Sequence, residues 1–136
     1  MMNTYYFDMD GVLANFHKAY ATNKATALSR DSMAALEPFV ENVATVRALI
    51  AAGNRVYILT KAANEAGKAG KIEWLARYIP EITAAQFICI IGHGSKVDFI
   101  REPGLLIDDD AKNTRPWVKA GYAALLLEAK GQPVAL

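Results

Sequence analysis

Two carboxylates spaced two residues apart follow an aromatic stretch near the start of the chain. Residues 5–7 are aromatic, Asp8 and Asp10 follow them, and Gly11 then opens the backbone into a loop. Because side chains alternate along an extended strand, residues two apart can point to the same side. Two acids in one small volume repel each other unless a cation or a shared proton relieves them. We therefore interpret the pair as costly for structure and useful for chemistry.

Other reactive groups follow the other apolar stretches. Thr60 ends the stretch 55–60, and Asp108, Asp109 and Asp110 come directly after the apolar residues 105–107. In an open parallel sheet the ligand site lies beyond the carboxyl ends of the strands. We therefore expect these side chains, with Asp8 and Asp10, to converge on one edge of a sheet.

The run Asp8-Met9-Asp10-Gly11-Val12 resembles the opening motif of the haloacid dehalogenase-like superfamily, whose members are mostly magnesium-dependent phosphohydrolases. The longer run 8–16 is most similar to the C-type 5'-nucleotidases, which dephosphorylate (deoxy)nucleotides. The superfamily signature continues with a threonine or serine after the second strand, a lysine ahead of the fourth and an acidic pair after the fourth. The residues that match in type and order are Thr60, Lys96, Asp108 and Asp109.

The resemblance implies a chemistry that explains these residue types. Phosphate esters resist nucleophilic attack, so their hydrolysis depends mostly on positioning and on charge neutralisation. We expect Asp8 to attack phosphorus and form an aspartyl-phosphate, and Asp10 to protonate the leaving oxygen and then activate the hydrolytic water. Thr60 would hydrogen-bond a phosphoryl oxygen. Lys96 would balance charge on both the nucleophile and the phosphate.

Mg²⁺ is the cofactor that this interpretation requires. It is a hard ion that prefers oxygen ligands in octahedral geometry, and Asp8, Asp108 and the phosphate would share it. By family resemblance, the backbone carbonyl of Asp10 is a further ligand and Asp109 orients the ligands. The predicted metal residues are therefore Asp8, Asp10, Asp108 and Asp109, with Asp110 a bystander.

Phe16 is the main candidate on the substrate side. In the nucleotidase family an aromatic residue at this position stacks on the nucleobase, which tolerates several bases because stacking needs only a flat face. The alternative is that Phe16 packs the surrounding segment, and Asn15 departs from the acid expected beside it. Lys61 is either a substrate ligand or a surface charge. Three further basic residues are predicted to be surface charges: Lys68, Lys71 and Arg115.

Length and composition describe one ordinary globular domain. The 136 residues are 53% hydrophobic and 21% charged, and the net charge is +1, so no overall field attracts nucleic acid or an anionic membrane. No apolar stretch approaches the ~20 residues of a membrane span, and no signal peptide is evident. With Cys89 as its single cysteine, we expect the protein in a reducing cytoplasm.

Apolar strands that alternate with helices predict a parallel sheet covered on both faces. The predicted strands are 4–7, 55–60, 87–91, 105–107 and 122–127; the predicted helices are 12–27, 39–52, 72–79 and 114–120. Asp31 is expected to cap a short turn, and Pro116 to lie in the first turn of the last helix. The fold expected is three-layer α/β/α and Rossmann-like, a single haloacid dehalogenase-like domain over 1–136. Residues 17–38, hereafter the insertion, would form a minimal helical cap.

These features favour a Mg²⁺-dependent phosphomonoesterase acting on (deoxy)nucleoside monophosphates. A small cap leaves the site open, which either admits larger phosphorylated substrates or requires a homodimer partner to complete the pocket. A phosphatase for other small or nucleic-acid-terminal phosphates is the alternative in the same class. A module that binds Mg²⁺ or phosphate without turnover is the alternative in another class, although paired Asp8 and Asp10 argue against it. Phosphomutase activity is a third option.

Overall fold

A central parallel sheet organises the chain in the computed structural model, which describes residues 2–136. Five strands pair in the order β3-β2-β1-β4-β5, and each pairing is parallel. Their bounds are Thr4–Phe7 for β1, Arg55–Ala62 for β2, Phe87–Ile91 for β3, Leu105–Asp108 for β4 and Ala124–Leu126 for β5. The predicted α/β class with a parallel sheet is confirmed.

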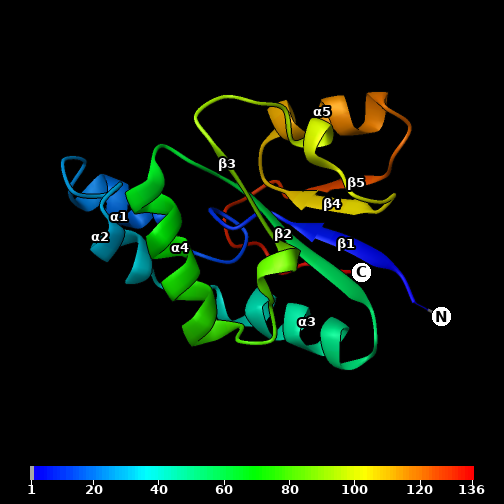
Figure 1. Ribbon diagram of the computed structural model, residues 1–136, viewed down its shortest axis with the longest axis horizontal. Coiled ribbons are helices and arrows are strands. Elements are labelled where there is room, and N and C mark those ends of the chain that lie inside the picture. Colours follow the sequence, from blue (N-terminus) through cyan, green and yellow to red (C-terminus); the bar gives the residue numbers. More distant parts are fainter. Residues whose placement is uncertain (1) are drawn as a thin grey trace.

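Helices cover both faces of the sheet: α3 and α4 lie on one face and α5 on the other (Figure 1). The helices are α1 (Phe16–Thr22), α2 (Arg30–Ala34), α3 (Val40–Ala51), α4 (Glu65–Tyr78) and α5 (Ala111–Lys119), with 3₁₀ turns η1 (Ala84–Gln86) and η2 (Lys96–Phe99). The expected three-layer arrangement is therefore present. Within residues 2–136, no helix has both the length and the apolar character to cross a bilayer.

Each face of the sheet has its own apolar core. Phe7, Ile58 and Trp74 belong to the core under α3 and α4, whereas Tyr6 and Trp117 belong to the core under α5. Tyr6 and Phe7 are neighbours and both are 0% exposed, because successive side chains of a strand point to opposite faces. A strand buried on both faces must be apolar at every position. This requirement explains the continuous apolar stretch before Asp8.

The register of the strands brings the ends of β1, β2 and β4 to one edge. Phe7 pairs with Ile58 on β2 and with Ile107 on β4. The N–H of Asp8 then donates to the carbonyl oxygen of Ile107 at 2.9 Å. Polar residues that follow these paired positions are thus neighbours in space, as the sequence predicted.

The segment after β1 differs from the predicted helix over 12–27. The carbonyl oxygen of Met9 accepts backbone N–H groups from residues 12–14, which closes a tight turn instead of starting a helix. Helix α1 begins only at Phe16, where the Asn15 side chain caps it by accepting from the N–H of Lys18 at 3.2 Å. The apolar residues of this turn are buried in the core and do not form one face of a helix. Their spacing nevertheless resembles that of a helix, which explains the wrong prediction.

Three helix starts also differ from the predictions. Ser29, not Asp31, caps α2, because its hydroxyl accepts from the N–H of Ser32 at 3.1 Å. Asp110 caps α5, so Pro116 lies inside the helix rather than in its first turn. Helix α4 begins at Glu65, well before the apolar stripe that predicted it, because the glycines and lysines in its first two turns hid the helical spacing.

The insertion packs against α4 through α2, and α1, α2 and α4 lie together at one end of the molecule (Figure 1). A Cβ atom added to Gly70 on α4 would lie 2.7 Å from Cβ of Met33 and would also collide with the carbonyl oxygen of Arg30. Trp74 of the same helix donates its indole N–H to the carbonyl oxygen of Leu36 at 2.9 Å. These contacts pack the insertion closely against α4.

Candidate active site

A cavity of about 200 Å³ opens at the edge where β1, β2 and β4 end. We call it the edge cavity. It gathers side chains from the loop after β1, from β2, from η2 and from the region after β4. Its lining consists of Asp8, Asp10, His17, Thr60, Lys61, Lys96, Asp109, Asp110, Asn113 and Lys130. The structure thus brings together six of the residues that the sequence predicted for catalysis, metal binding or substrate binding.

Lys96 connects two buried carboxylates of this site. Its Nζ atom donates to Oδ1 of Asp8 at 2.8 Å and to Oδ2 of Asp108 at 2.7 Å. The lysine is only 1% exposed and Asp108 is fully buried. Burial opposes the charged form of Lys96, but the two carboxylates outweigh it and raise its pKa. A buried ammonium group therefore stands between the predicted nucleophile and the predicted metal ligand.

Burial raises the pKa of Asp8 well above its ordinary value, because desolvation penalises the carboxylate. Lys96 opposes this effect, whereas the neighbouring charges of Asp108 and Asp10 add to it. One ammonium group cannot neutralise two buried carboxylates, so a proton on Asp8 relieves the excess negative charge. A cation bound at the same place would relieve it equally well.

Three acids could supply ligands to such a cation. Asp8, Asp108 and Asp109 each offer one carboxylate oxygen, and these oxygens lie within 4.8 Å of one another. A set made only of oxygens suits a hard divalent ion such as Mg²⁺. The carboxylate of Asp10 does not belong to this group. Three of the four predicted metal residues therefore present side chains that fit the ion.

Gly11 makes room for Asp109 in this group. Its φ angle is +85°, which L side chains rarely adopt, and an added Cβ would lie 2.7 Å from the carboxylate carbon of Asp109. Lys130 forms an ion pair with the same carboxylate. Across the site, four carboxylates (Asp8, Asp10, Asp108 and Asp109) are paired with three ammonium groups (Lys71, Lys96 and Lys130). These groups therefore include one more carboxylate than ammonium group.

Lys71 was predicted to be a surface charge, and this prediction is wrong. It has no exposed surface, and its Nζ atom donates to Oγ1 of Thr60 and to Oδ2 of Asp10, both at 2.9 Å. The sequence did contain a signal: Lys71 precedes Trp74 by three positions and Leu75 by four, so it shares their face of a helix. All three side chains are buried on α4.

Two further residues of the edge cavity were not predicted from the sequence. Lys130 comes from the segment after the last strand, which carries no motif, and Asn113 comes from α5. His17 also lines the cavity, as does Asp110, which was predicted to be a bystander. Asp110 has a structural role as well, because its carboxylate caps α5 by accepting from the N–H of Lys112 at 2.9 Å.

Phe16 lies outside the edge cavity but lines one next to it. This second cavity measures about 150 Å³ and shares Asp10 and Lys61 with the edge cavity. Its other lining residues are mostly apolar: Phe16, Leu28, Met33, Ala62, Ala63 and Gly67. An apolar space therefore adjoins the charged one, and the carboxylate of Asp10 borders both.

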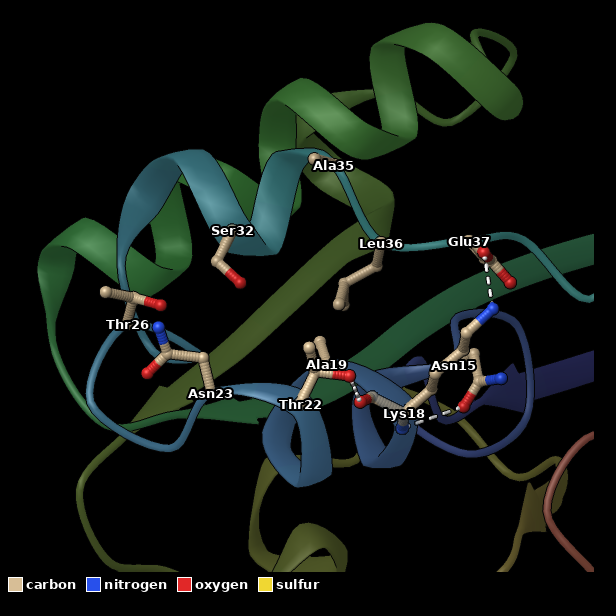
Figure 2. Close-up of a pocket in the computed structure, with 10 residues that line it drawn as sticks. All are labelled: Asn15, Lys18, Ala19, Thr22, Asn23, Thr26, Ser32, Ala35, Leu36 and Glu37. Atoms are coloured by element: carbon tan, nitrogen blue, oxygen red, sulfur yellow. Dashed lines mark hydrogen bonds and ion pairs between the residues drawn. The ribbon is translucent and has the colours of Figure 1, made fainter.

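A larger cavity, of about 320 Å³, lies within the insertion and contains none of the clustered acids. Figure 2 shows Ser32 and Leu36 facing Ala19 and Thr22 of α1 across this space. At its border, Lys18 and Glu37 form an exposed ion pair at 2.8 Å. The larger of these two cavities is therefore not the one that gathers the acids.

No protein-family model matches this sequence, and no curated protein matches it. Among solved structures, a chain of the one described as "Structure of Pnkp1/Rnl/Hen1 complex" is similar, with a TM-score of 0.67 and 16% sequence identity. The likeness covers 93% of this chain and 46% of that chain, so this chain spans less than half the length of its neighbour. At this identity the likeness supports the fold alone.

Proposed function

We propose that the protein is a Mg²⁺-dependent phosphomonoesterase of the haloacid dehalogenase-like type that works through an aspartyl-phosphate. One observation carries the proposal. The carboxylate of Asp8 lines the edge cavity, has one oxygen held by Lys96, and lies within metal-sharing distance of Asp108 and Asp109. A purely structural acid pair gains nothing from this arrangement, which leaves carboxylates in excess over ammonium groups.

In the first step, Asp8 attacks phosphorus with the oxygen that Lys96 does not hold. A bond forms between this oxygen and phosphorus, the bond from phosphorus to the ester oxygen breaks, and the ester oxygen takes a proton from Asp10. The products are an aspartyl-phosphate on Asp8, the free alcohol and the carboxylate of Asp10. This exchange replaces one difficult displacement with two easier ones.

In the second step, water attacks the phosphorus of the aspartyl-phosphate. Asp10 takes one proton from the water as the new bond forms, and the bond between phosphorus and Asp8 breaks. Inorganic phosphate leaves and both carboxyl groups return to their starting states. The same side chain thus acts as acid and then as base, as the reversed direction of proton transfer requires.

The other residues of the edge cavity bind and neutralise the phosphoryl group. Thr60 donates its hydroxyl hydrogen to a phosphoryl oxygen, and Lys96 and Lys61 supply positive charge. A Mg²⁺ ion held by Asp8, Asp108 and Asp109 would supply further charge neutralisation in the same place. These contributions suit phosphoryl transfer, in which positioning and electrostatic stabilisation do most of the work.

The apolar cavity beside Asp10 supports a nucleoside monophosphate as substrate. Asp10 must contact the leaving oxygen, so the leaving group lies on its side of the site, where Phe16 and Met33 offer apolar surface. A flat base fits such a surface by stacking. A terminal phosphate on a larger molecule is the second candidate, because His17, Lys61 and Asp110 at the cavity are all exposed.

A screen of phosphomonoesters with and without Mg²⁺ tests the proposal, with the variant Asp8→Asn as the matched comparison. We expect phosphate release that requires the metal and disappears in Asp8→Asn. Turnover that persists in this variant would contradict the assignment of the nucleophile. Measurable Mg²⁺ binding without turnover of any phosphomonoester would instead favour a binding module.

A further inference from the structure

Lys71 is the one fully buried lysine in the described chain that the proposed chemistry does not yet use. Burying an ammonium group is expensive unless it is paired and hydrogen-bonded. Lys71 has the side-chain length to reach the site from α4, and both of its partners, Asp10 and Thr60, have roles in the proposed reaction. A helix of this kind could place any apolar side chain there at lower cost, so the lysine calls for a functional explanation.

The hydrogen bond to Thr60 sets the direction in which its hydroxyl group can donate. An ammonium group has donors and no acceptor, so Oγ1 of Thr60 must accept from Lys71. Its single hydrogen is then left for another acceptor, and Thr60 lines the edge cavity. The oxygens of a phosphoryl group are acceptors. Lys71 thus prepares Thr60 to donate to the substrate before the substrate arrives.

The hydrogen bond to Asp10 holds one oxygen of its carboxyl group. Oδ2 accepts from the ammonium group of Lys71 at 2.9 Å, which fixes the position of this oxygen. Oδ1 is buried and has no hydrogen-bond partner among residues 2–136. A carboxyl group held at one oxygen is also restricted in rotation, which favours a single reactive geometry.

Lys71 itself is absent from the lining of the edge cavity, so it acts through its two partners. Its network is separate from that of Lys96, since the two lysines share no hydrogen-bond partner. One lysine holds the nucleophile and a metal ligand, and the other holds the acid and the phosphate donor. Gly70 and Trp74 on either side of Lys71 fix α4 against the insertion, which keeps the ammonium group in place.

We infer that Lys71 is a positioning residue that orients the proton-donating carboxyl group of Asp10 and the hydroxyl group of Thr60. This inference rests on the proposed function. It adds that the two buried lysines hold different groups of the site: Lys96 holds the nucleophile and a metal ligand, and Lys71 holds the acid and the phosphate donor. It makes a chemical prediction. Loss of Lys71 should matter most for substrates whose leaving oxygen needs a proton, and least for substrates whose leaving group departs as a stable anion.

The test compares two substrates in the variant Lys71→Met. One is the alkyl phosphate that the phosphomonoester screen finds to be turned over fastest, and the other is p-nitrophenyl phosphate, whose leaving group needs no proton. We expect kcat/KM to fall by about 10²-fold or more for the alkyl phosphate, and by only about tenfold for p-nitrophenyl phosphate. The ratio kcat/KM is used because it reports the step that forms the aspartyl-phosphate.

Lys68→Met is the matched control, because Lys68 lies one turn earlier on α4 and lines none of the cavities described above. It should leave both kcat/KM values unchanged. Lys71→Gln, which keeps a polar donor at the site, should lose less than Lys71→Met and show the same order of substrates. If Lys71→Met does not fold, Lys71→Gln provides the comparison alone.

A second measurement needs no turnover. The ¹⁵N resonance of the Lys71 ammonium group should shift in Asp10→Asn and in Thr60→Val, and should not shift in Lys68→Met. Equal loss of kcat/KM on both substrates, or no loss on either, would overturn the positioning role while leaving the phosphatase proposal intact. A wild-type protein inert toward every phosphomonoester in the presence of Mg²⁺ would instead remove the proposed function itself.

Discussion

The edge cavity and the cavity within the insertion differ in the way the chain builds them. The edge cavity is the smaller, at about 200 Å³ against about 320 Å³, but its charged groups are held by strand ends and by buried lysines. The insertion cavity is lined from short helices, and its one ion pair, between Lys18 and Glu37, is 61% and 63% exposed. Burying charged groups costs free energy even when they are paired, so a buried charged cluster indicates a functional site. Empty volume between surface helices gives no such indication.

Removing Lys96 should produce the largest effect on the edge cavity. Lys96→Met leaves the buried carboxylates of Asp8 and Asp108 without their shared partner, which should cost about 3–5 kcal/mol of stability. Denaturant unfolding without metal measures this loss. Added Mg²⁺ should restore part of it by neutralising the same carboxylates. A variant as stable as the wild type would show that the edge cavity does not depend on its buried charges.

Gly11→Ala sharpens the comparison by disturbing one ligand without removing any charge. The new Cβ would collide with Asp109. The alanine would also have to adopt a φ angle of +85°, which L residues rarely do. We expect weaker Mg²⁺ binding by calorimetry and a stability loss of roughly 1–3 kcal/mol. Gly53→Ala is the control, because it has a similar φ of +90° but no atom within 4 Å of the added Cβ. Equal Mg²⁺ affinity in the two variants would exclude Asp109 from the metal group.

The burial of Asp8 should make the stability of the metal-free protein depend on pH. Its pKa is raised above the ordinary value of 3.8, chiefly by burial, so the folded state holds the proton more tightly than the unfolded state. The stability that this proton contributes is present at pH values below 3.8 and is lost as the pH rises through the raised pKa. In EDTA, the Tm of Asp8→Asn should therefore exceed that of the wild type increasingly from pH 4 to pH 8.

Mg²⁺ should reverse this order, because the ion stabilises the carboxylate and binds only weakly to the asparagine variant. A thermal shift with Mg²⁺ at pH 8 checks the reversal. If the Tm difference between the two proteins did not change with pH, Asp8 would not be the group whose burial strains the site.

The smallest effect is expected in the insertion cavity. Lys18→Met removes an exposed ion pair, and such pairs contribute within about 0.5 kcal/mol. Both kcat/KM and the Tm should stay close to the wild-type values. A large loss of activity in Lys18→Met would show that the insertion cavity takes part in the reaction and that the two cavities do not differ in this respect.

The sequence predicted the strands well because burial on both faces leaves a continuous apolar signal, as in Thr4–Phe7 and Phe87–Ile91, whose bounds the structure reproduces. It also predicted that Asp8, Thr60 and Asp109 meet, since parallel strand ends share an edge. Helix ends were less predictable, because a hydroxyl such as that of Ser29 decides them locally.

Two lysines of the site show why the remainder was harder to predict. Lys71 was misjudged because lysines are usually exposed, and only its helical spacing relative to Trp74 indicated burial. Lys130 could not be found, because it reaches Asp109 through a contact between segments 21 residues apart that no periodicity encodes. Spacing reports which face a residue occupies, and it does not report which residue of another segment it meets.

Trapping the phosphorylated protein tests the central claim most directly. Rapid acid quench of the wild type during turnover of a ³²P-labelled phosphomonoester with Mg²⁺ should give labelled protein. Hydroxylamine should release the label, as expected for an acyl phosphate, and peptide mapping should place it on Asp8. Turnover without covalent label, or a label on a residue other than Asp8, would contradict the account.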